Sequence, residues 1–176
     1  TNGGFVLKDG VSPSAAIADI FKNGRKYATE CATAMVIVYY GALLNVYPQE
    51  LFDKTFRNIT LMNWHNLDPT LGDIGMINDV SDDIPGDRRY FKNPDVDMTV
   101  PEWQGENTID LGNGKYYGHG AGVYPSDSII NMLNKYRKQD AQRSAFLMET
   151  AGNPNYKKLS AMLTKYQESH RTEISA

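Results

Sequence analysis

The feature that most constrains the fold is a run of apolar side chains between Thr29 and Pro48. The apolar positions are Ala32, Met35, Val36, Tyr39, Tyr40 and Leu43. They cover nearly the whole surface of one helix, and Thr29 is a suitable N-cap that puts Cys31 in the first turn. A helix that is apolar nearly all round is stable only in the centre of a domain. The chain, at 176 residues, is long enough for one such domain and too short for two comfortable ones.

The charge balance argues against partners that bind a strongly basic surface. The chain carries 18 Lys and Arg against 21 Asp and Glu, a formal net charge of −3. It therefore lacks the positive field that holds proteins on nucleic acid or on an anionic membrane. The longest apolar run, Ala32–Leu44, is shorter than the roughly 18 residues of a membrane-spanning helix. We expect neither nucleic acid nor a membrane as a partner, and the first residues lack the pattern of an export signal.

Cys31 is the one cysteine of the chain, which excludes an intrachain disulfide and a cysteine zinc cluster. A cysteine among apolar neighbours is often a buried structural residue. At a helix N-terminus, however, unpaired backbone N–H groups and the helix dipole favour the thiolate. Cys31 is therefore either a core residue or a reactive thiol, and the residues around it decide between the two.

The rest of the chain predicts shorter helices and a small antiparallel sheet. Residues 108–111 and 115–118 alternate around a Gly-Asn-Gly sequence, which is a strong hairpin signal. The predicted fold class is α+β, with the long central helix packed on the sheet. The other expected elements are helices at 13–21, 51–58, 125–136, 142–150 and 156–167 and a buried strand at 59–62.

A long acidic segment, residues 66–87, interrupts this pattern. It contains six Asp and no Lys or Arg. A solvated insertion is the simplest interpretation, although loops of this length are usually functional or mobile. The segment lacks the spacing and the final Glu of a calcium-binding hand, so we do not expect calcium there.

The predicted hairpin brings an acid and a histidine together. If the turn has two residues, Thr108 lies opposite His119, and Glu106 and His119 become diagonal neighbours on one face, roughly 7–8 Å apart at the backbone. With Cys31 they form a system in which the thiolate attacks, the imidazole transfers a proton and the acid fixes its tautomer. With a three-residue loop the pairing slips by one residue and the two side chains separate.

Other residues compete for these roles. Glu30 is either a second carboxylate beside Cys31 or a residue that only stabilises the helix start. His65 ends the predicted strand and competes with His119 as the base. A structural histidine and a surface carboxylate are the simpler interpretations of His119 and Glu106. Cys31, His65 and His119 lack the short spacings of metal ligands, so no metal and no cofactor is expected.

Six ordered blocks of the sequence carry a family resemblance. They are Pro13-Ser14 with Ala16-Ile17, Glu30-Cys31-Ala32-Thr33-Ala34 with Val36-Ile37-Val38-Tyr39-Tyr40, Trp64-His65, Tyr90-Phe91-Lys92-Asn93-Pro94, Trp103-Gln104-Gly105-Glu106-Asn107, and Lys115-Tyr116 with His119-Gly120. On these blocks the chain resembles the bacillary protein-glutamine gamma-glutamyltransferases, spore-coat transglutaminases with a papain-like core related to NlpC/P60 peptidases. The family has Arg where Gln104 stands here, a shorter acidic loop, and a segment ahead of the first block.

The resemblance implies a catalytic domain over residues 13–150, preceded by an irregular lead-in at 1–12 and followed by a helical tail at 151–176. It also implies site residues, which stand in the matching blocks. They are the nucleophile Cys31, with Glu106, His119 and Glu30 around it, and the substrate-binding residues Trp103, Trp64 and Asn107.

The implied reaction is protein cross-linking through a thioester. The Cys31 thiolate attacks a glutamine carboxamide, ammonia leaves, and a lysine amine attacks the thioester, whereas water in that second step gives deamidation. The alternatives are a deamidase or amidohydrolase on the same core, the toxic catalytic domain of a larger bacterial competition protein with a neutralising immunity-type partner, and a binding domain without activity. The implied setting is bacterial: the spore coat or cytoplasm, or a target cell for a delivered toxin domain.

Overall fold

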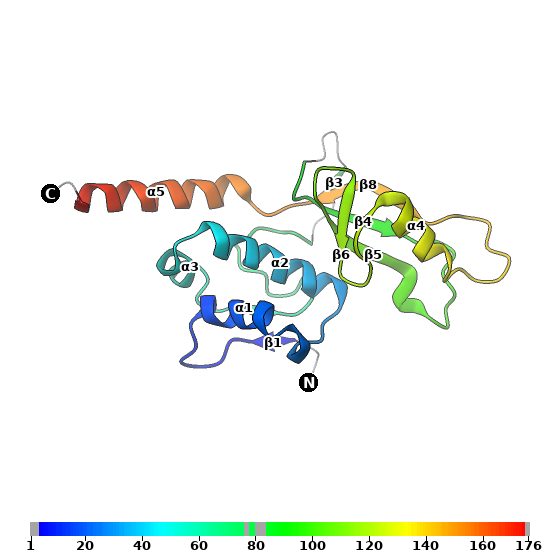
Figure 1. Ribbon diagram of the computed structural model, residues 1–176, viewed down its shortest axis with the longest axis horizontal. Helices are drawn as coiled ribbons and strands as arrows, with labels where there is room; N and C mark the ends of the chain where they lie inside the picture. The colour runs from blue at the N-terminus through cyan, green and yellow to red at the C-terminus, as the bar shows by residue number, and fades with distance from the viewer. Residues whose placement is uncertain (1–3, 76–77, 80–83, 175–176) are drawn as a thin grey trace. The chain divides into compact units, whose positions relative to one another are not determined.

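The computed structural model describes residues 4–75, 78–79 and 84–174, and it confirms a mixed α+β fold (Figure 1). The chain divides into two compact units. The first consists of Thr1–Thr29, Val36–Asp73 and Pro154–Ala176, and the second of Glu30–Met35 and Ile74–Asn153. Each unit therefore combines segments that are far apart in the sequence.

The first unit is mainly helical. Strand β1 (Phe5–Val6) pairs antiparallel with β2 (Thr60–Leu61), so part of the lead-in expected to be irregular is a strand, while its residues 1–3 lie outside the described residues. The predicted helices at 13–21, 51–58 and 156–167 are confirmed with shifted ends. None of the helices in the described part of the chain is long and apolar enough to cross a membrane. The helices are α1 (Pro13–Lys22), the 3-10 turn Gly24–Lys26, α2 (Cys31–Val46, from Val36 onward in this unit), α3 (Gln49–Thr55) and α5 (Tyr156–Ile174).

An aromatic cluster forms the core of the first unit. Tyr40 of α2 meets Phe52 and Phe56 edge to face, with ring centroids 6.2 and 5.1 Å apart. Such ring pairs add about 0.5–1.5 kcal/mol each beyond the area they bury. Val36 and Tyr39 are buried as well. The prediction that the apolar segment is a buried central helix is therefore confirmed.

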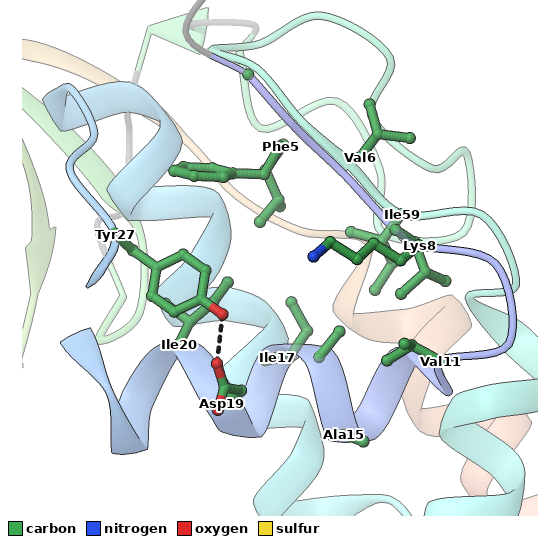
Figure 2. A pocket seen from close by; sticks show the side chains of 14 residues that line it. Phe5, Val6, Lys8, Val11, Ala15, Ile17, Asp19, Ile20, Tyr27 and Ile59 are labelled. Carbon is green, nitrogen blue, oxygen red and sulfur yellow. Dashed lines mark hydrogen bonds between the residues drawn. The ribbon is translucent and has the colours of Figure 1, made fainter. Parts of the chain in front are cut away.

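A cavity of about 600 Å³ lies in the first unit beside α1 and β1 (Figure 2). Its wall is largely apolar and includes Phe5 and Ile17, and the Lys8 side chain extends along it. The Tyr27 hydroxyl donates a hydrogen bond to the Asp19 carboxylate there, and this bond holds the pKa of Asp19 below its usual range. None of the residues expected to carry the chemistry lines this cavity.

The second unit is built on an antiparallel sheet (Figure 1). The order of its strands is β3-β8-β4-β5-β6-β7. A 3-10 turn at Pro101–Gln104 leads into β5, and helix α4 (Ser126–Asn134) follows β7 and confirms the helix predicted at 125–136. The strands are β3 (Asn78–Asp79), β4 (Arg88–Lys92), β5 (Gly105–Asp110), β6 (Lys115–Gly118), β7 (Gly122–Pro125) and β8 (Phe146–Gly152).

Helix α4 covers one face of this sheet. Leu133 of α4 shares a buried apolar cluster with Phe91 of β4 and Tyr116 of β6, whose rings lie edge to face at 5.3 Å. Because side chains alternate along a strand, residues one position away from Phe91 face the opposite side. Tyr90 and its β5 partner Asn107 therefore belong to the face turned away from α4.

Two predictions, for residues 142–150 and for the acidic segment 66–87, differ from the structure. The expected helix at 142–150 is wrong, because Phe146–Gly152 form β8, which is hydrogen-bonded to β3 and β4. A short apolar run fits a helix or a strand equally, and pairing with distant strands decides here. The acidic segment 66–87 is not simply a solvated loop. It contains β3, and it ends at the buried Asp87, whose carboxylate accepts a hydrogen bond from Asn153; its residues 76–77 and 80–83 lie outside the described residues.

Candidate active site

Cys31 is the first residue of α2, as predicted, but a different residue caps the helix. The Glu30 carboxylate accepts hydrogen bonds from the backbone N–H groups of Ala32 (2.6 Å) and Thr33 (2.7 Å) and from the Thr33 hydroxyl. The Glu30 carbonyl also accepts the first helical hydrogen bond at 3.1 Å. Glu30, rather than the predicted Thr29, is therefore the N-cap, because its longer side chain reaches back over the first turn.

Asn107 links the sheet to the sulfur. Its side-chain amide donates a hydrogen bond to Cys31 Sγ at 3.3 Å. Asn107 lies in β5 directly opposite Tyr90 of β4 and is 8% exposed, while Cys31 is half-buried. An amide donor at this distance stabilises negative charge on sulfur. Asn107, expected from the sequence to bind substrate, thus contacts the candidate nucleophile itself.

Tyr90 is a residue of this site that the sequence analysis did not single out. Burial raises the pKa of Tyr90, and negative charge on Cys31 and on Glu106 raises it further. Both groups therefore lie close enough to the Tyr90 hydroxyl to act on it electrostatically. The signal available in the sequence was its alternation with the buried Phe91, which places Tyr90 on the opposite face of the strand.

The hairpin between β5 and β6 has a three-residue loop, so the predicted pairing is wrong by one residue. Thr108 lies opposite Gly118 rather than His119. The loop spans residues 112–114, and both of its glycines adopt positive φ angles of 79° and 74°, which glycine tolerates without strain. A two-residue turn would have used only one of these glycines. With this register, Glu106 and His119 are no longer diagonal neighbours on one face.

Glu106 instead contacts the backbone of the segment that follows β6. Its carboxylate accepts hydrogen bonds from the N–H of Gly120, at 3.1 Å, and from the N–H of His119. Burial raises the pKa of Glu106, which is 5% exposed, and the two amide hydrogen bonds oppose that shift. A buried carboxyl group with a raised pKa is suited to transferring protons.

His119 lies at the surface. Its side chain is exposed, and the part of the chain that the structure describes gives the imidazole no hydrogen-bond partner. Continuing the observed register one residue beyond Gly118 places His119 opposite Asn107. In this register His119 lies beside Asn107, which donates a hydrogen bond to Cys31 Sγ, and no longer diagonal to Glu106. The role of His119 as a base stays a prediction.

The two tryptophans expected to bind substrate lie in different units. Trp103 is half-buried in the second unit and stacks flat on Tyr136, with ring centroids 4.1 Å apart and planes 3° apart. Trp64 is half-buried in the first unit, within a turn that Met62 and His65 close through a β-bridge. The structure thus shows what holds the Trp103 ring, while the roles of both tryptophans in substrate binding stay predictions.

Metal-ligating side chains do not gather in the described part of the chain. Across residues 4–75, 78–79 and 84–174, no group of three or more His, Cys, Asp or Glu could hold a metal ion. Cys31, His65 and His119, the set considered from the sequence, form no such group.

Comparisons with known proteins agree with the resemblance. The profile of a family described as protein-glutamine gamma-glutamyltransferase matches residues 1–163. A protein of that name from Bacillus cereus (strain G9842) is 50% identical over 149 residues, which cover 84% of this chain and 52% of the relative, and one from Bacillus anthracis gives the same values. A solved transglutaminase from Geobacillus stearothermophilus, without its C-terminal extension, matches with a TM-score of 0.82 and 46% identity over 92% of this chain and 75% of that chain. The chain spans about half the length of the curated relatives it matches.

Proposed function

The chain belongs to the protein-glutamine gamma-glutamyltransferase family, and we propose that it cross-links proteins by joining glutamine to lysine side chains. The observation that carries the proposal is the position of Cys31 Sγ, at the start of α2 and 3.3 Å from the Asn107 amide. A helix N-terminus and an amide donor both favour a thiolate nucleophile. The enzyme is therefore a cysteine-dependent acyltransferase, with glutamine- and lysine-bearing proteins as its substrates.

In the first half-reaction, the Cys31 thiolate attacks the carbonyl carbon of a glutamine carboxamide. A carbon–sulfur bond forms, and the carbon–nitrogen bond breaks when the nitrogen receives a proton, so that ammonia leaves and a thioester remains. Glu106 is the proposed proton donor. Burial raises its pKa, which keeps a larger protonated fraction available at a given pH than an exposed glutamate has.

In the second half-reaction, a neutral lysine amine attacks the thioester carbon. The carbon–nitrogen bond of the isopeptide forms, the carbon–sulfur bond breaks, and the thiolate is regenerated. The Glu106 carboxylate, deprotonated in the first step, takes the proton that the amine loses, so the carboxyl returns to its starting state. Water in place of the amine gives a glutamate side chain, which is the deamidase alternative.

Two donors near the sulfur suit the oxyanion that forms in both steps. In the first turn of α2, Glu30 takes the N–H groups of Ala32 and Thr33, while the Cys31 N–H has no acceptor within the described residues. The Asn107 side chain supplies the second donor. Fixed donors of this kind are usually the largest single contribution to acyl-transfer catalysis.

The remaining predicted residues take supporting roles in this proposal. Glu30 has both carboxylate oxygens engaged in capping, which supports a role in fixing the helix start that carries the nucleophile. His119 is the second candidate for proton transfer. Trp103 and Trp64 are proposed to contact substrate, and the stacking of Trp103 on Tyr136 supports it as a rigid apolar wall that keeps water from the thioester.

The test is incorporation of a fluorescent primary amine into casein. We expect the protein to label casein, and Cys31→Ala to abolish labelling while circular dichroism shows an unchanged fold. A protein that labels no casein, with Cys31 intact and reduced, contradicts the proposal.

Mass spectrometry of the glutamine substrate separates the two chemistries. Cross-linking joins two chains with loss of ammonia, whereas hydrolysis converts a side-chain amide to an acid without joining chains. A product that is hydrolysed in the presence of saturating amine supports the deamidase alternative instead.

The bacterial setting has support from the relatives, which come from Bacillus species. On the basis of the family resemblance, we propose the spore coat or the cytoplasm as the location of the protein. Delivery into a target cell, with a neutralising immunity-type partner, stays a prediction that cytoplasmic expression tests. Toxicity that Cys31→Ala relieves supports delivery, and unimpaired growth contradicts it.

A further inference from the structure

We propose that Arg88 is a positioning residue that orients the Asn107 amide toward Cys31 and so fixes a donor for the reaction. The inference rests on the proposed function, in which Asn107 stabilises the thiolate and the oxyanion. It adds a residue that no sequence feature marked, because Arg88 stands in the charged run Asp87-Arg88-Arg89, which is typical of a surface loop.

Arg88 is held rigidly inside the second unit. It lies in β4 and is 2% exposed. Its Nε donates to the carbonyl of Ile74 at 2.8 Å, and its Nη2 donates to the carbonyl of Gly75 at 3.3 Å. Its Nη1 donates to Asn107 Oδ1 at 2.8 Å. Two backbone contacts thus fix the planar guanidinium, and the third contact reaches the active site.

The chemistry of the guanidinium determines how Asn107 is turned. An arginine side chain has only donors, whereas an asparagine amide has an oxygen acceptor at one end and an NH₂ donor at the other. The end that faces Arg88 is therefore the oxygen, and the NH₂ group is left to face Cys31. Reversing the amide would set two donors against each other. The hydrogen bond of 3.3 Å from Asn107 to the sulfur follows from the one of 2.8 Å from Arg88.

The charge of Arg88 acts in the same direction. A cation bound to the oxygen end polarises the amide and strengthens donation from its other end. That donor meets a thiolate before the reaction and an oxyanion during it, and both are anionic. We therefore expect loss of Arg88 to weaken the transition state more than it weakens glutamine binding.

Arg89 supplies a matched control in the same strand. It is 6% exposed and faces the other side of the sheet, where it donates to the carbonyls of Thr150 (3.2 Å) and Met148 (3.1 Å). Arg88→Lys and Arg89→Lys each replace a buried guanidinium, with its planar set of N–H donors, by an ammonium group. Both variants keep the positive charge. A purely structural role for Arg88 predicts similar behaviour of the two variants.

The experiment compares amine incorporation and thiol alkylation in these variants. We expect Arg88→Lys to lower kcat by roughly 10- to 100-fold with KM for glutamine nearly unchanged, and to move the pH dependence of Cys31 alkylation by iodoacetamide to higher pH. Arg89→Lys should keep the wild-type kcat and alkylation profile, even where both variants lose similar thermal stability. Arg88→Gln replaces Arg88→Lys if the lysine variant does not fold.

A double-mutant cycle with Asn107→Ala tests the coupling directly. Since Arg88 acts through Asn107, Arg88→Lys should have little further effect on kcat in the Asn107→Ala background. Additive losses, or an Arg88→Lys kcat equal to that of Arg89→Lys, overturn the inference. If the wild-type protein incorporates no amine, the proposed function fails. The alkylation profiles then decide the role of Arg88 on their own, and unshifted profiles overturn it.

Discussion

At Glu106, burial and hydrogen bonding act in opposite directions on one carboxyl group. Burial favours the neutral form, and the N–H groups of Gly120 and His119 favour the carboxylate. Burial is the larger effect, so the pKa is raised. A group that must give a proton in one step and take one in the next needs such a balance.

Glu106→Gln is expected to lower kcat by roughly 100- to 10,000-fold, because a positioned acid–base group contributes that much to catalysis. The measurement is the pH profile of amine incorporation, from which the ionisation belonging to Glu106 should disappear. Asp110→Asn, at the other end of β5, is the control and should keep the wild-type profile. A Glu106→Gln enzyme with wild-type kcat excludes Glu106 from proton transfer.

The same raised pKa predicts an effect on stability. The folded state binds the Glu106 proton more tightly than the unfolded state, so the stability due to this proton is present at low pH and is lost as the pH rises through the folded pKa. Glu106→Gln carries no such charge, and its stability relative to wild type should therefore increase with pH across this range. Urea unfolding from acidic to neutral pH measures the difference, and a difference independent of pH contradicts the assignment.

The sequence predicted the position of some site residues but not of others. Cys31 was placed correctly because helical periodicity fixes where a helix begins to within a turn. Arg88 was missed as a site residue because no local pattern shows that this charged side chain is buried in a strand. The alternation of Tyr90 with Phe91 gave its face of the strand, but not that Cys31 and Glu106 lie near it. Their partners come from distant segments, and only the folded chain brings them together.

At the scale of elements, the start of α2 depends on a carboxylate cap. Glu30→Ala removes the acceptor of two backbone N–H groups and should lower the free energy of unfolding by about 1 kcal/mol. Ser12→Ala removes the cap of α1, where the hydroxyl accepts the Ala15 N–H, and should cost a similar amount. Urea denaturation compares the two. Only Glu30→Ala is expected to change Cys31 alkylation, and equal alkylation in both variants contradicts a link between this cap and the nucleophile.

Strand β5 depends on a close approach at Gly105. A Cβ there would lie 2.1 Å from the Tyr90 hydroxyl oxygen and 2.6 Å from the Phe91 carbonyl oxygen. Gly105→Ala should therefore destabilise the protein by about 1–3 kcal/mol through overpacking. Gly24→Ala, where a Cβ meets nothing within 4 Å, is the control and should be nearly neutral. Equal melting temperatures for the two variants would show that β4 moves to accommodate the added methyl group without loss of stability.

The sequence predicted the elements that have a long helical periodicity of apolar residues. It failed for the segment whose conformation depends on pairing with distant strands. The helices of the first unit have apolar faces that the sequence displays, whereas β8 acquires its strand conformation from β3 and β4. The β5–β6 register depended on one residue of loop length. A Gly-Asn-Gly sequence supports both lengths, so only the structure distinguishes them.

At the scale of the whole molecule, the Asp95 carboxylate of the second unit makes stability depend on pH in the acid range. Asp95 accepts hydrogen bonds from the Arg143 side chain, at 2.9 and 2.5 Å, and from the backbone N–H groups of Gln142 and Arg143. These contacts lower the pKa of Asp95 to about 2, with the Arg143 side chain as the largest cause. The stability they supply is present above the unfolded pKa of about 3.9 and is lost as the pH falls through the folded value.

Asp95→Asn is therefore expected to be less stable than wild type near neutral pH and to approach wild-type stability as the pH falls from about 4 to about 2. Thermal unfolding in this range measures the convergence. Asp9→Asn, at an exposed carboxylate of the first unit, is the control. A constant gap between Asp95→Asn and wild type down to the lowest pH contradicts the assignment.

The division into two units was not predictable from the sequence. The length of the chain and its continuous apolar helix both favour a single core. Neither feature shows that Glu30–Met35 belong to the same unit as Ile74–Asn153. The α+β class was predictable because it needs only the types of element. Which segments share a unit depends on long-range contacts that no window of sequence contains.

The hydrogen bond between Cys31 and Asn107 joins residues 76 positions apart. A fragment that ends between α2 and β5 contains the thiol but not this amide donor. Under the proposed function, such a fragment lacks one of the two donors that stabilise the thiolate and the oxyanion. We therefore expect it to be less reactive toward glutamine than the chain that includes β5.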